Sequence, residues 1–264
     1  RALYLSADNI NVLSQGLFNI AQTYFSLGGE ALFIDEVHKY PNWSIEIKNI
    51  LDTYKQKQVV FSASSSLDLT KSKADLSRRV VYYKLSGLSF REFLAFNRVI
   101  NIEPLSLNDI INNHVSIAEK LAHTTILKHF NQYLQHGYYP FYLENQADFL
   151  TKLNNIVEKV IDEDIAVCYN LKQSTLPILK KLLWLIISSE GLQPNIDKIS
   201  RNMGISREVI YSCFEYLDRA GLTSNIKQKT TGIKVTRKPG KIFMDNTNLI
   251  VAINTTLTSA NLIG

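Results

Sequence analysis

Two adjacent carboxylates, Asp35 and Glu36, directly follow the apolar run Ala-Leu-Phe-Ile at residues 31–34. Burying an unpaired charge is costly, so an apolar strand that ends in acids is expected to end at an edge of its sheet. In a nucleotide hydrolase, such a strand carries the Asp to the carboxyl edge, where it helps to hold Mg²⁺ while the next Glu orients or deprotonates water. The same pattern fits a strand that is followed by a solvated turn, and the pair alone does not separate the two interpretations.

The first third of the chain alternates short apolar runs with helical stretches, which is typical of a parallel sheet with crossover helices. Strands are predicted at 2–7, 31–35, 58–64 and 79–85, and helices at 11–27 and 43–56. The strands are almost wholly apolar, so we expect helices on both faces of the sheet. The apolar sides of the two helices are predicted to carry Leu13, Leu17, Ile20 and Tyr24, and then Ile45, Ile47, Ile50 and Leu51.

The periodicity of the sequence is helical from about residue 89 to residue 170, and a compact unit follows. A helix over 175–189 precedes a short helix, a turn at 203–205, and a longer helix that begins at Ser206 and ends at Gly221. This is the layout of a helix-turn-helix. The runs 223–228 and 232–244 predict a β-hairpin after it, so the unit is interpreted as a winged helix.

Composition indicates a soluble protein that does not enter a membrane. The chain has 264 residues, of which 45% are hydrophobic, and no apolar run approaches the roughly 18–20 residues that cross a bilayer. Cys168 and Cys213 lack metal-type partners at short spacing and are too few for a disulfide scaffold, so a reducing cytoplasm is expected. The net charge of +5 permits contact with a polyanion.

Several motifs resemble, in order and spacing, those of a known ATPase family. The motifs are LFIDEVHKYPNW (32–43), VVFSASSS (59–66), RRVVYYKL (78–85) and LSGLSFREFL (85–94). They resemble bacterial and archaeal AAA+ ATPases that carry a C-terminal winged helix and often a nuclease-like domain of unknown function. Stretches at 133–144, 156–171 and 240–253 resemble later parts of the same family, so the resemblance covers nearly the whole chain.

The resemblance implies an α/β fold in which an incomplete P-loop AAA+ parallel sheet core precedes a helical connector and a winged-helix domain. The implied boundaries are 1–97 for the ATPase core, 98–171 for the connector and 172–253 for the winged helix. The tail, 254–264, would then lead to a further C-terminal domain.

The same resemblance implies roles for individual residues, with ATP and Mg²⁺ as cofactors. Asp35 would be the Walker B aspartate, which holds Mg²⁺ through water, and Glu36 would polarise the attacking water. The sensor-1 position would be Ser62 or Ser64, although the family usually has Gly-Ser where this chain has Ala63-Ser64. Arg79 aligns with an arginine before the last core strand, where an arginine finger would act on a neighbour's nucleotide. A solvated helix end is the alternative for Arg79.

The phosphate-binding motif of a P-loop ATPase, G-x-x-x-x-G-K-[ST], does not occur in these 264 residues. By resemblance, it lies upstream on the first strand and helix of the domain. We therefore expect the natural polypeptide to extend before Arg1, and we expect this chain alone to bind ATP weakly or not at all.

Two functions from different classes follow from the sequence. The first is an ATP-binding and ATP-hydrolysing molecular switch of unknown target. The alternative is a winged-helix nucleic-acid-binding protein whose ATPase region is degenerate and structural. Its DNA contacts would come from these basic residues: Arg207, Lys227, Lys229, Lys234, Arg237 and Lys238.

The longer helix of the winged-helix unit argues against DNA, because it also carries Glu208, Glu215 and Asp218. Acidic side chains are repelled by phosphate. The balance favours a module for packing, for a protein partner or for self-association.

Overall fold

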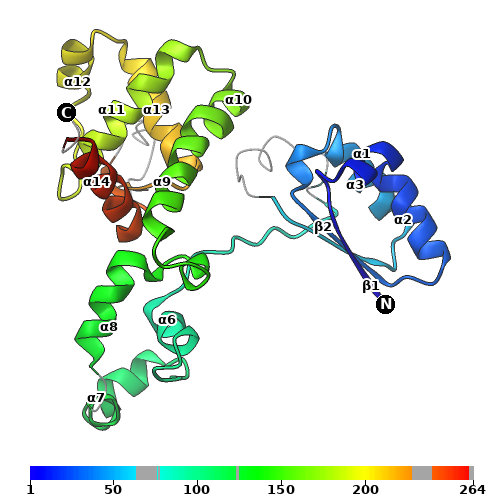
Figure 1. Cartoon of the computed structure of the whole chain (residues 1–264), viewed down its shortest axis with the longest axis horizontal. Coiled ribbons are helices and arrows are strands. Elements are labelled where there is room, and N and C mark those ends of the chain that lie inside the picture. The colour runs from blue at the N-terminus through cyan, green and yellow to red at the C-terminus, as the bar shows by residue number, and fades with distance from the viewer. Residues whose placement is uncertain (64–75, 77, 123–124, 228–239, 262–264) are drawn as a thin grey trace, which may run out of the picture. The chain divides into compact units, whose positions relative to one another are not determined.

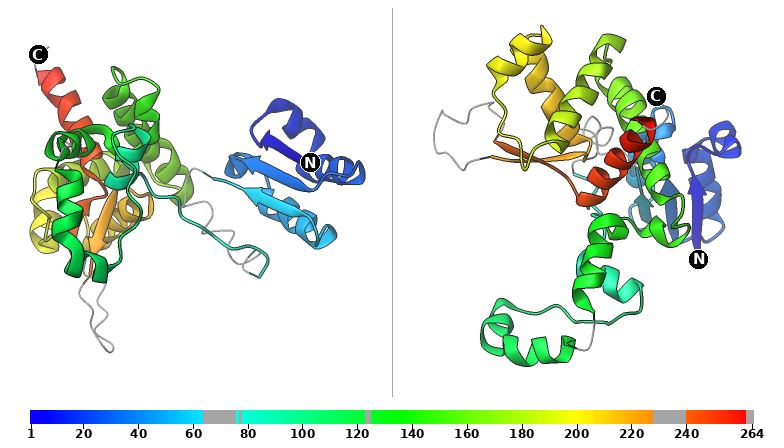
Figure 2. Two further views of the ribbon diagram at one scale, coloured as in Figure 1. Left: turned by 90° about the horizontal axis from the view of Figure 1, so that it is seen from below. Right: turned by 60° about the vertical axis from the view of Figure 1, so that its left-hand side comes forward.

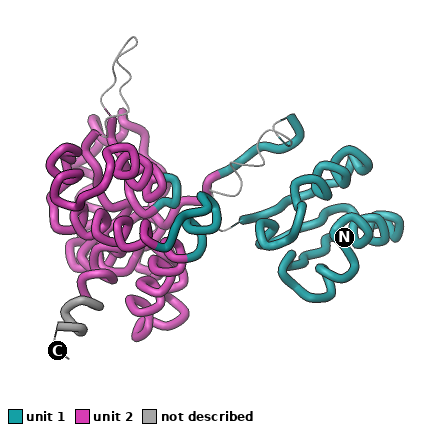
Figure 3. The backbone as a smooth tube through the Cα atoms, turned by 90° about the horizontal axis from the view of Figure 1, so that it is seen from above, with its two compact units in different colours: residues 1–83, 163–173, 219–221 teal, residues 84–162, 174–218, 222–264 magenta. Residues whose placement is uncertain are grey.

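The computed structural model describes residues 1–63, 76, 78–122, 125–227 and 240–261, with side chains as far as Thr255. The chain divides into two compact units (Figure 3). The first comprises 1–83, 163–173 and 219–221, and the second comprises 84–162, 174–218 and 222–264. Among the described helices, none combines the length and the hydrophobicity of a membrane-spanning segment. The domain boundaries predicted from the sequence stay predictions.

The first unit is built on a parallel three-stranded sheet, which confirms the α/β class expected from the sequence. The strands β1 (Ala2–Ser6), β2 (Ala31–Asp35) and β3 (Gln58–Phe61) pair in the order β1-β2-β3 (Figure 1). Helices α1 (Ile10–Gln15) and α2 (Leu17–Ser26) connect β1 to β2, and α3 (Trp43–Thr53) connects β2 to β3.

Both connections pack on one face of the sheet. The buried core combines Leu32 and Ile34 of β2 with helix residues such as Leu17, Ile47 and Ile50. Crossovers between parallel strands are almost always right-handed, so two successive crossovers in the same direction are expected to place their helices on the same side of the sheet.

The opposite face is the open face of the sheet. It presents Tyr4, Phe33 and Val60, which are exposed. The expectation that helices cover both faces is therefore wrong for the described residues.

Two predicted helical features also differ from the structure. The helix expected over 11–27 is broken at Gly16, whose φ of +87° lies where L-residues are rare, so α1 and α2 are separate. Two residues predicted on the apolar sides of the helices, Leu13 of α1 and Ile45 of α3, are exposed. The buried side of α2 consists of Leu17, Ala21 and Phe25.

The segment 79–85 forms no strand in the described structure, contrary to prediction. A strand needs a hydrogen-bonded neighbour. No described strand pairs with this segment. The side chains of Val81, Tyr83 and Leu85 are consequently exposed, Leu85 to 99%.

The second unit is mainly helical, as the sequence pattern predicts. Helix α6 (Phe90–Phe96) begins with a capping box in which the Ser89 hydroxyl and the Glu92 carboxylate satisfy each other's backbone N–H groups. The other helices beyond the first sheet are α7 (Leu107–Leu121), α8 (Ile126–Gln132), α9 (Phe149–Lys159), α10 (Ala166–Tyr169), α11 (Leu176–Ile187), α12 (Ile196–Met203), α13 (Arg207–Arg219) and α14 (Thr247–Asn261).

Helices α12 and α13 are joined by a tight turn, and a strand pair follows them. Gly204, with a φ of +65°, ends α12. Strands β4 (Thr223–Ile226) and β5 (Lys241–Met244) lie side by side and antiparallel (Figure 2). A single bridge between Leu192 and Ile242 adds a third backbone segment beside β5. The pairing of the two predicted hairpin strands is confirmed, while residues 228–239 between them lie outside the described part of the chain.

Candidate active site

The carboxyl ends of the three parallel strands meet at one edge of the sheet, where polar side chains follow each strand. Asp35 ends β2, and Ser62 comes directly after β3. Backbone hydrogen bonds continue past the strands: Ala7 N–H donates to Asp35 O at 2.8 Å, and Ser62 N–H donates to Ile34 O at 2.9 Å. These bonds hold Asp35 and Ser62 in register at the edge.

The Asp35 carboxylate accepts three hydrogen bonds. Its Oδ1 accepts the Ser62 hydroxyl and, at 3.0 Å, the backbone N–H of Glu36, while its Oδ2 accepts the Tyr4 hydroxyl at 2.7 Å. The Ser62 and Tyr4 hydroxyls hold the pKa of Asp35 below its usual value, although partial burial works in the opposite direction. Asp35 is therefore a carboxylate at neutral pH. The same bond to Asp35 raises the pKa of Tyr4.

Glu36 begins a 3₁₀ turn over Val37–Lys39 and has a left-handed backbone, with a φ of +54°. That conformation costs an L-residue about 1–2 kcal/mol, so the surrounding contacts must hold it. Glu36 Oε2 lies 3.3 Å from Lys39 Nζ and 3.3 Å from His38 Nε2. The turn therefore folds two nitrogen-bearing side chains back onto the carboxylate that precedes them.

Lys39 links Glu36 to a second acid, Asp8, which follows β1. Lys39 Nζ donates to Asp8 Oδ2 at 3.2 Å, and the Ser6 hydroxyl donates to Asp8 Oδ1 at 2.5 Å. The hydrogen bond to Asp8 raises the pKa of Lys39, while Ser6 and then Lys39 lower the pKa of Asp8. The edge is therefore a network of charged groups that joins the ends of β1 and β2.

The chemistry of Asp35 fits a hydrated Mg²⁺ better than a dry metal site. An ionised carboxylate offers about four acceptor positions, of which three are used here, so one remains for a metal-bound water. Mg²⁺ usually keeps several waters and relies on one or two carboxylates together with substrate phosphates. Over the described residues, no group of three or more His, Cys, Asp or Glu side chains is arranged to hold a metal ion.

Arg79 is exposed in a turn after the helical residue Leu76, and its guanidinium makes a bidentate ion pair there. Its Nε and Nη2 donate to Asp52 Oδ1 and Oδ2 at 2.7 and 3.0 Å, and the pair lowers the pKa of Asp52. Asp52 is nine residues beyond Trp43 at the start of α3, a rise of about 14 Å along the helix. Because α3 runs antiparallel to the strands, Arg79 lies toward the opposite edge of the sheet from Asp35.

The other predicted site residues have mixed outcomes. Ser64 lies outside the described residues, so only Ser62 is seen at the predicted sensor position. Arg207 Nε pairs with Asp197 Oδ1 at 2.8 Å, and Lys227 is exposed after β4. Four of the predicted DNA-contacting residues lie outside the described part of the chain: Lys229, Lys234, Arg237 and Lys238.

Sequence reasoning missed Tyr4, Asp8 and Lys39. Asp8 follows the first strand, so the rule that singled out Asp35 also applies to it. Tyr4 is two positions before Ser6, and Ser6 pairs in register with Asp35. Because side chains alternate along a strand, Tyr4, Ser6 and Asp35 all lie on the open face of the sheet. Nothing in the sequence signals the reach of the Tyr4 hydroxyl to Asp35.

A parallel α/β sheet with an anchored acid at its carboxyl edge is an arrangement typical of nucleotide-hydrolysing domains. Comparison with protein families agrees with this class, because residues 1–94 match the model of an AAA domain. The N-terminal region is thus similar to AAA domains, a class of ATPase-like domains that in general depend on ATP and Mg²⁺.

The larger part of the chain matches a second family. Residues 127–259, about half of the sequence, match the model of a domain of unknown function (DUF8612), and the chain belongs to that family. The chain is also similar to the uncharacterized protein MJ1637 of Methanocaldococcus jannaschii, with 26% identity over 254 residues. The match covers 92% of this chain and 53% of that protein, so the chain spans about half the length of the curated relative it matches.

Proposed function

We propose that this chain forms part of an ATP-binding, ATP-hydrolysing AAA+ molecular switch. The observation that carries the proposal is the anchoring of Asp35 at the carboxyl edge of the sheet by Ser62 and Tyr4. The match of residues 1–94 to an AAA domain supports it. The proposal assigns no target to the switch, because the descriptions of the DUF8612 family and of the similar protein state no activity.

In this proposal, each residue at the edge has a distinct role. Asp35 accepts a hydrogen bond from a water on Mg²⁺, and Mg²⁺ neutralises charge on the phosphates when bound. Ser62 orients the Asp35 carboxylate and is the sensor residue. Glu36 accepts a proton from the attacking water, which requires its carboxylate to turn away from Lys39 or His38. Because its side chain is 27% exposed, Glu36 is accessible to that water.

Arg79 is the proposed arginine finger, and its ion pair with Asp52 must open before it can act. Its guanidinium uses two donors on Asp52, so it must leave that pair before it reaches a neighbour's nucleotide. Both side chains are partly exposed, and such pairs contribute about 0.2–1 kcal/mol, so the exchange is energetically feasible.

Asp35→Asn tests the proposal in the natural protein. We expect Mg²⁺-dependent ATP hydrolysis to fall about 10–100-fold, because outer-shell partners of a metal carry effects of that size. A coupled assay of ADP release across a range of Mg²⁺ concentrations measures it. Asp148→Asn is the matched control, since Asp148 is an exposed carboxylate before α9. A natural protein without ATPase activity, or an Asp35→Asn variant with unchanged activity, would contradict the proposal.

We further propose that residues 172–253 form a winged helix. Helices α11, α12 and α13 precede the β4–β5 pair, and β5 also packs against α11. In that fold, α13 would be the recognition helix, but Arg207 at its start is already paired with Asp197. The pairing and the acids of α13 favour a protein partner or a second copy of the chain over DNA.

A salt titration of DNA binding separates the two functions. For the whole protein, we expect no retention of duplex DNA on a filter at low salt, because α13 presents no unopposed positive face. DNA-binding proteins that neutralise several phosphates lose affinity steeply between about 50 and 200 mM salt. Tight binding with such a slope would instead support the nucleic-acid-binding alternative.

A further inference from the structure

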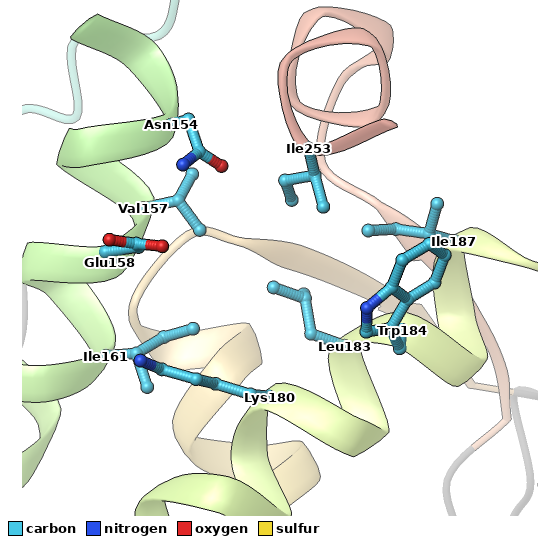
Figure 4. Close-up of a pocket in the computed structure, with 9 residues that line it drawn as sticks. All are labelled: Asn154, Val157, Glu158, Ile161, Lys180, Leu183, Trp184, Ile187 and Ile253. Carbon is cyan, nitrogen blue, oxygen red and sulfur yellow. The ribbon is translucent and has the colours of Figure 1, made fainter. Parts of the chain in front are cut away.

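A pocket of about 140 Å³ lies in the second unit between α9, α11 and α14 (Figure 4). Val157 of α9, Ile161 of the π-helical segment Val160–Ile165 that follows α9, Leu183 of α11 and Ile253 of α14 supply buried apolar lining. The indole of Trp184 forms a further, partly exposed wall. The volume is similar to that of an engineered apolar cavity of about 150 Å³ that binds benzene.

The pocket contains one buried polar side chain, that of Asn154. Figure 4 shows its amide projecting from α9 toward the space that Ile253 faces from α14. The residue is only 9% exposed, and its side-chain amide makes no hydrogen bond within the described chain, but the amide oxygen and nitrogen are not sealed from solvent, so water in the pocket reaches them. A ligand that displaces this water loses little if its own polar groups reproduce the hydrogen bonds, so the amide provides a polar anchor within an otherwise apolar pocket.

A second buried asparagine in the same unit shows the usual arrangement. Asn248 of α14 is fully buried, and its amide is satisfied by backbone groups: Oδ1 accepts from Tyr138 N–H at 2.8 Å, and Nδ2 donates to Tyr133 O and Leu134 O at 3.1 and 2.9 Å. Asn154 differs from Asn248 because its amide faces a pocket rather than the backbone of a neighbouring segment.

We propose that the pocket binds a small, flat aromatic molecule that carries an amide edge. The apolar walls and the face of Trp184 suit an aromatic ring, and their area would be removed from water. The Asn154 amide offers a donor next to an acceptor, which pairs reciprocally with a carboxamide or a lactam of the ligand.

The rim of the pocket is charged, which places the mouth in water. Lys180 Nζ pairs with Asp162 Oδ2 at 2.7 Å, and Glu158 lies exposed one turn beyond Asn154. A ligand of this class would therefore insert its ring and amide while a polar substituent stays at the rim. The site is separate from the residues of the proposed ATPase centre, and it does not depend on that function.

Titration of the whole protein with benzamide tests the site, with methyl benzoate as a probe that keeps the ring and the carbonyl but lacks the N–H donors. We expect saturable benzamide binding by ligand-observed NMR and calorimetry, and about tenfold weaker binding of methyl benzoate. Asn154→Leu should weaken benzamide about tenfold and remove the preference between the two probes.

Two further variants make the result decisive. Leu183→Trp fills the pocket and should abolish binding of both probes, while Asn155→Leu, at the exposed neighbour on α9, should leave both affinities unchanged. The proposal is overturned if benzamide does not bind saturably, if Asn154→Leu leaves its affinity unchanged, or if methyl benzoate binds as tightly as benzamide. Far-UV circular dichroism of each variant checks that it is folded.

Discussion

Replacing Glu36 by Gln is expected to stop ATP hydrolysis by the natural protein while nucleotide binding persists. Gln keeps the size and the hydrogen-bonding shape of the side chain but cannot take a proton from water. A general base contributes about 10²–10⁴-fold to a rate, so we expect kcat to fall within that range. Single-turnover hydrolysis and equilibrium binding of a labelled nucleotide measure the two properties separately.

The structure indicates why this variant should still fold. The contact of Glu36 with Lys39 is partly exposed, and pairs of this kind contribute about 1 kcal/mol or less. Its left-handed backbone is set by the end of β2 and the turn that follows, and Gln adopts it no less readily than Glu. Glu103→Gln, at an exposed position between α6 and α7, is the control. If hydrolysis survives Glu36→Gln, the catalytic role of Glu36 is wrong. The Asp-Glu pair would then be only the end of a strand that is followed by a solvated turn.

The position of the candidate site could be predicted from the sequence because it follows from a local rule. An apolar strand that ends in a polar residue marks a sheet edge, and the carboxyl ends of parallel strands meet at one edge. Asp35 was predicted in this way, while Ser62 or Ser64 was implied by the family resemblance, and Asp35 and Ser62 lie in contact. The contacts of Tyr4 and Lys39 depend on how far individual side chains reach, which spacing in the sequence does not encode.

The errors in the predicted fold come from non-local features. A run such as 79–85 has the composition of a strand, but whether it pairs depends on a neighbour elsewhere in the chain. The covered face of the sheet depends on the direction of successive crossovers, and composition alone did not reveal it. Gly16 interrupts an otherwise helical pattern, and only its φ of +87° shows that α1 and α2 are separate helices.

Substitution by Leu should destabilise the protein at only one of two buried asparagines in the second unit, Asn248 and Asn154. Asn248→Leu removes the acceptor of Tyr138 N–H and a donor to Tyr133 O, while Leu134 O keeps a bond from the Thr247 hydroxyl at 2.6 Å. Each polar group left unsatisfied in the interior costs about 1–3 kcal/mol. We therefore expect Asn248→Leu to lower the free energy of unfolding by about 3 kcal/mol.

Asn154→Leu should leave the free energy of unfolding unchanged or raise it, since it removes an amide that the described chain does not satisfy and adds apolar surface to an apolar pocket. Urea titrations of the two variants, followed by circular dichroism, compare the same change at two buried helical sites. The contrast follows from the partners of each amide, because both side chains are at least nine-tenths buried. Equal losses at the two positions would mean that the Asn154 amide already contributes to folding, and the case for an external partner would fail.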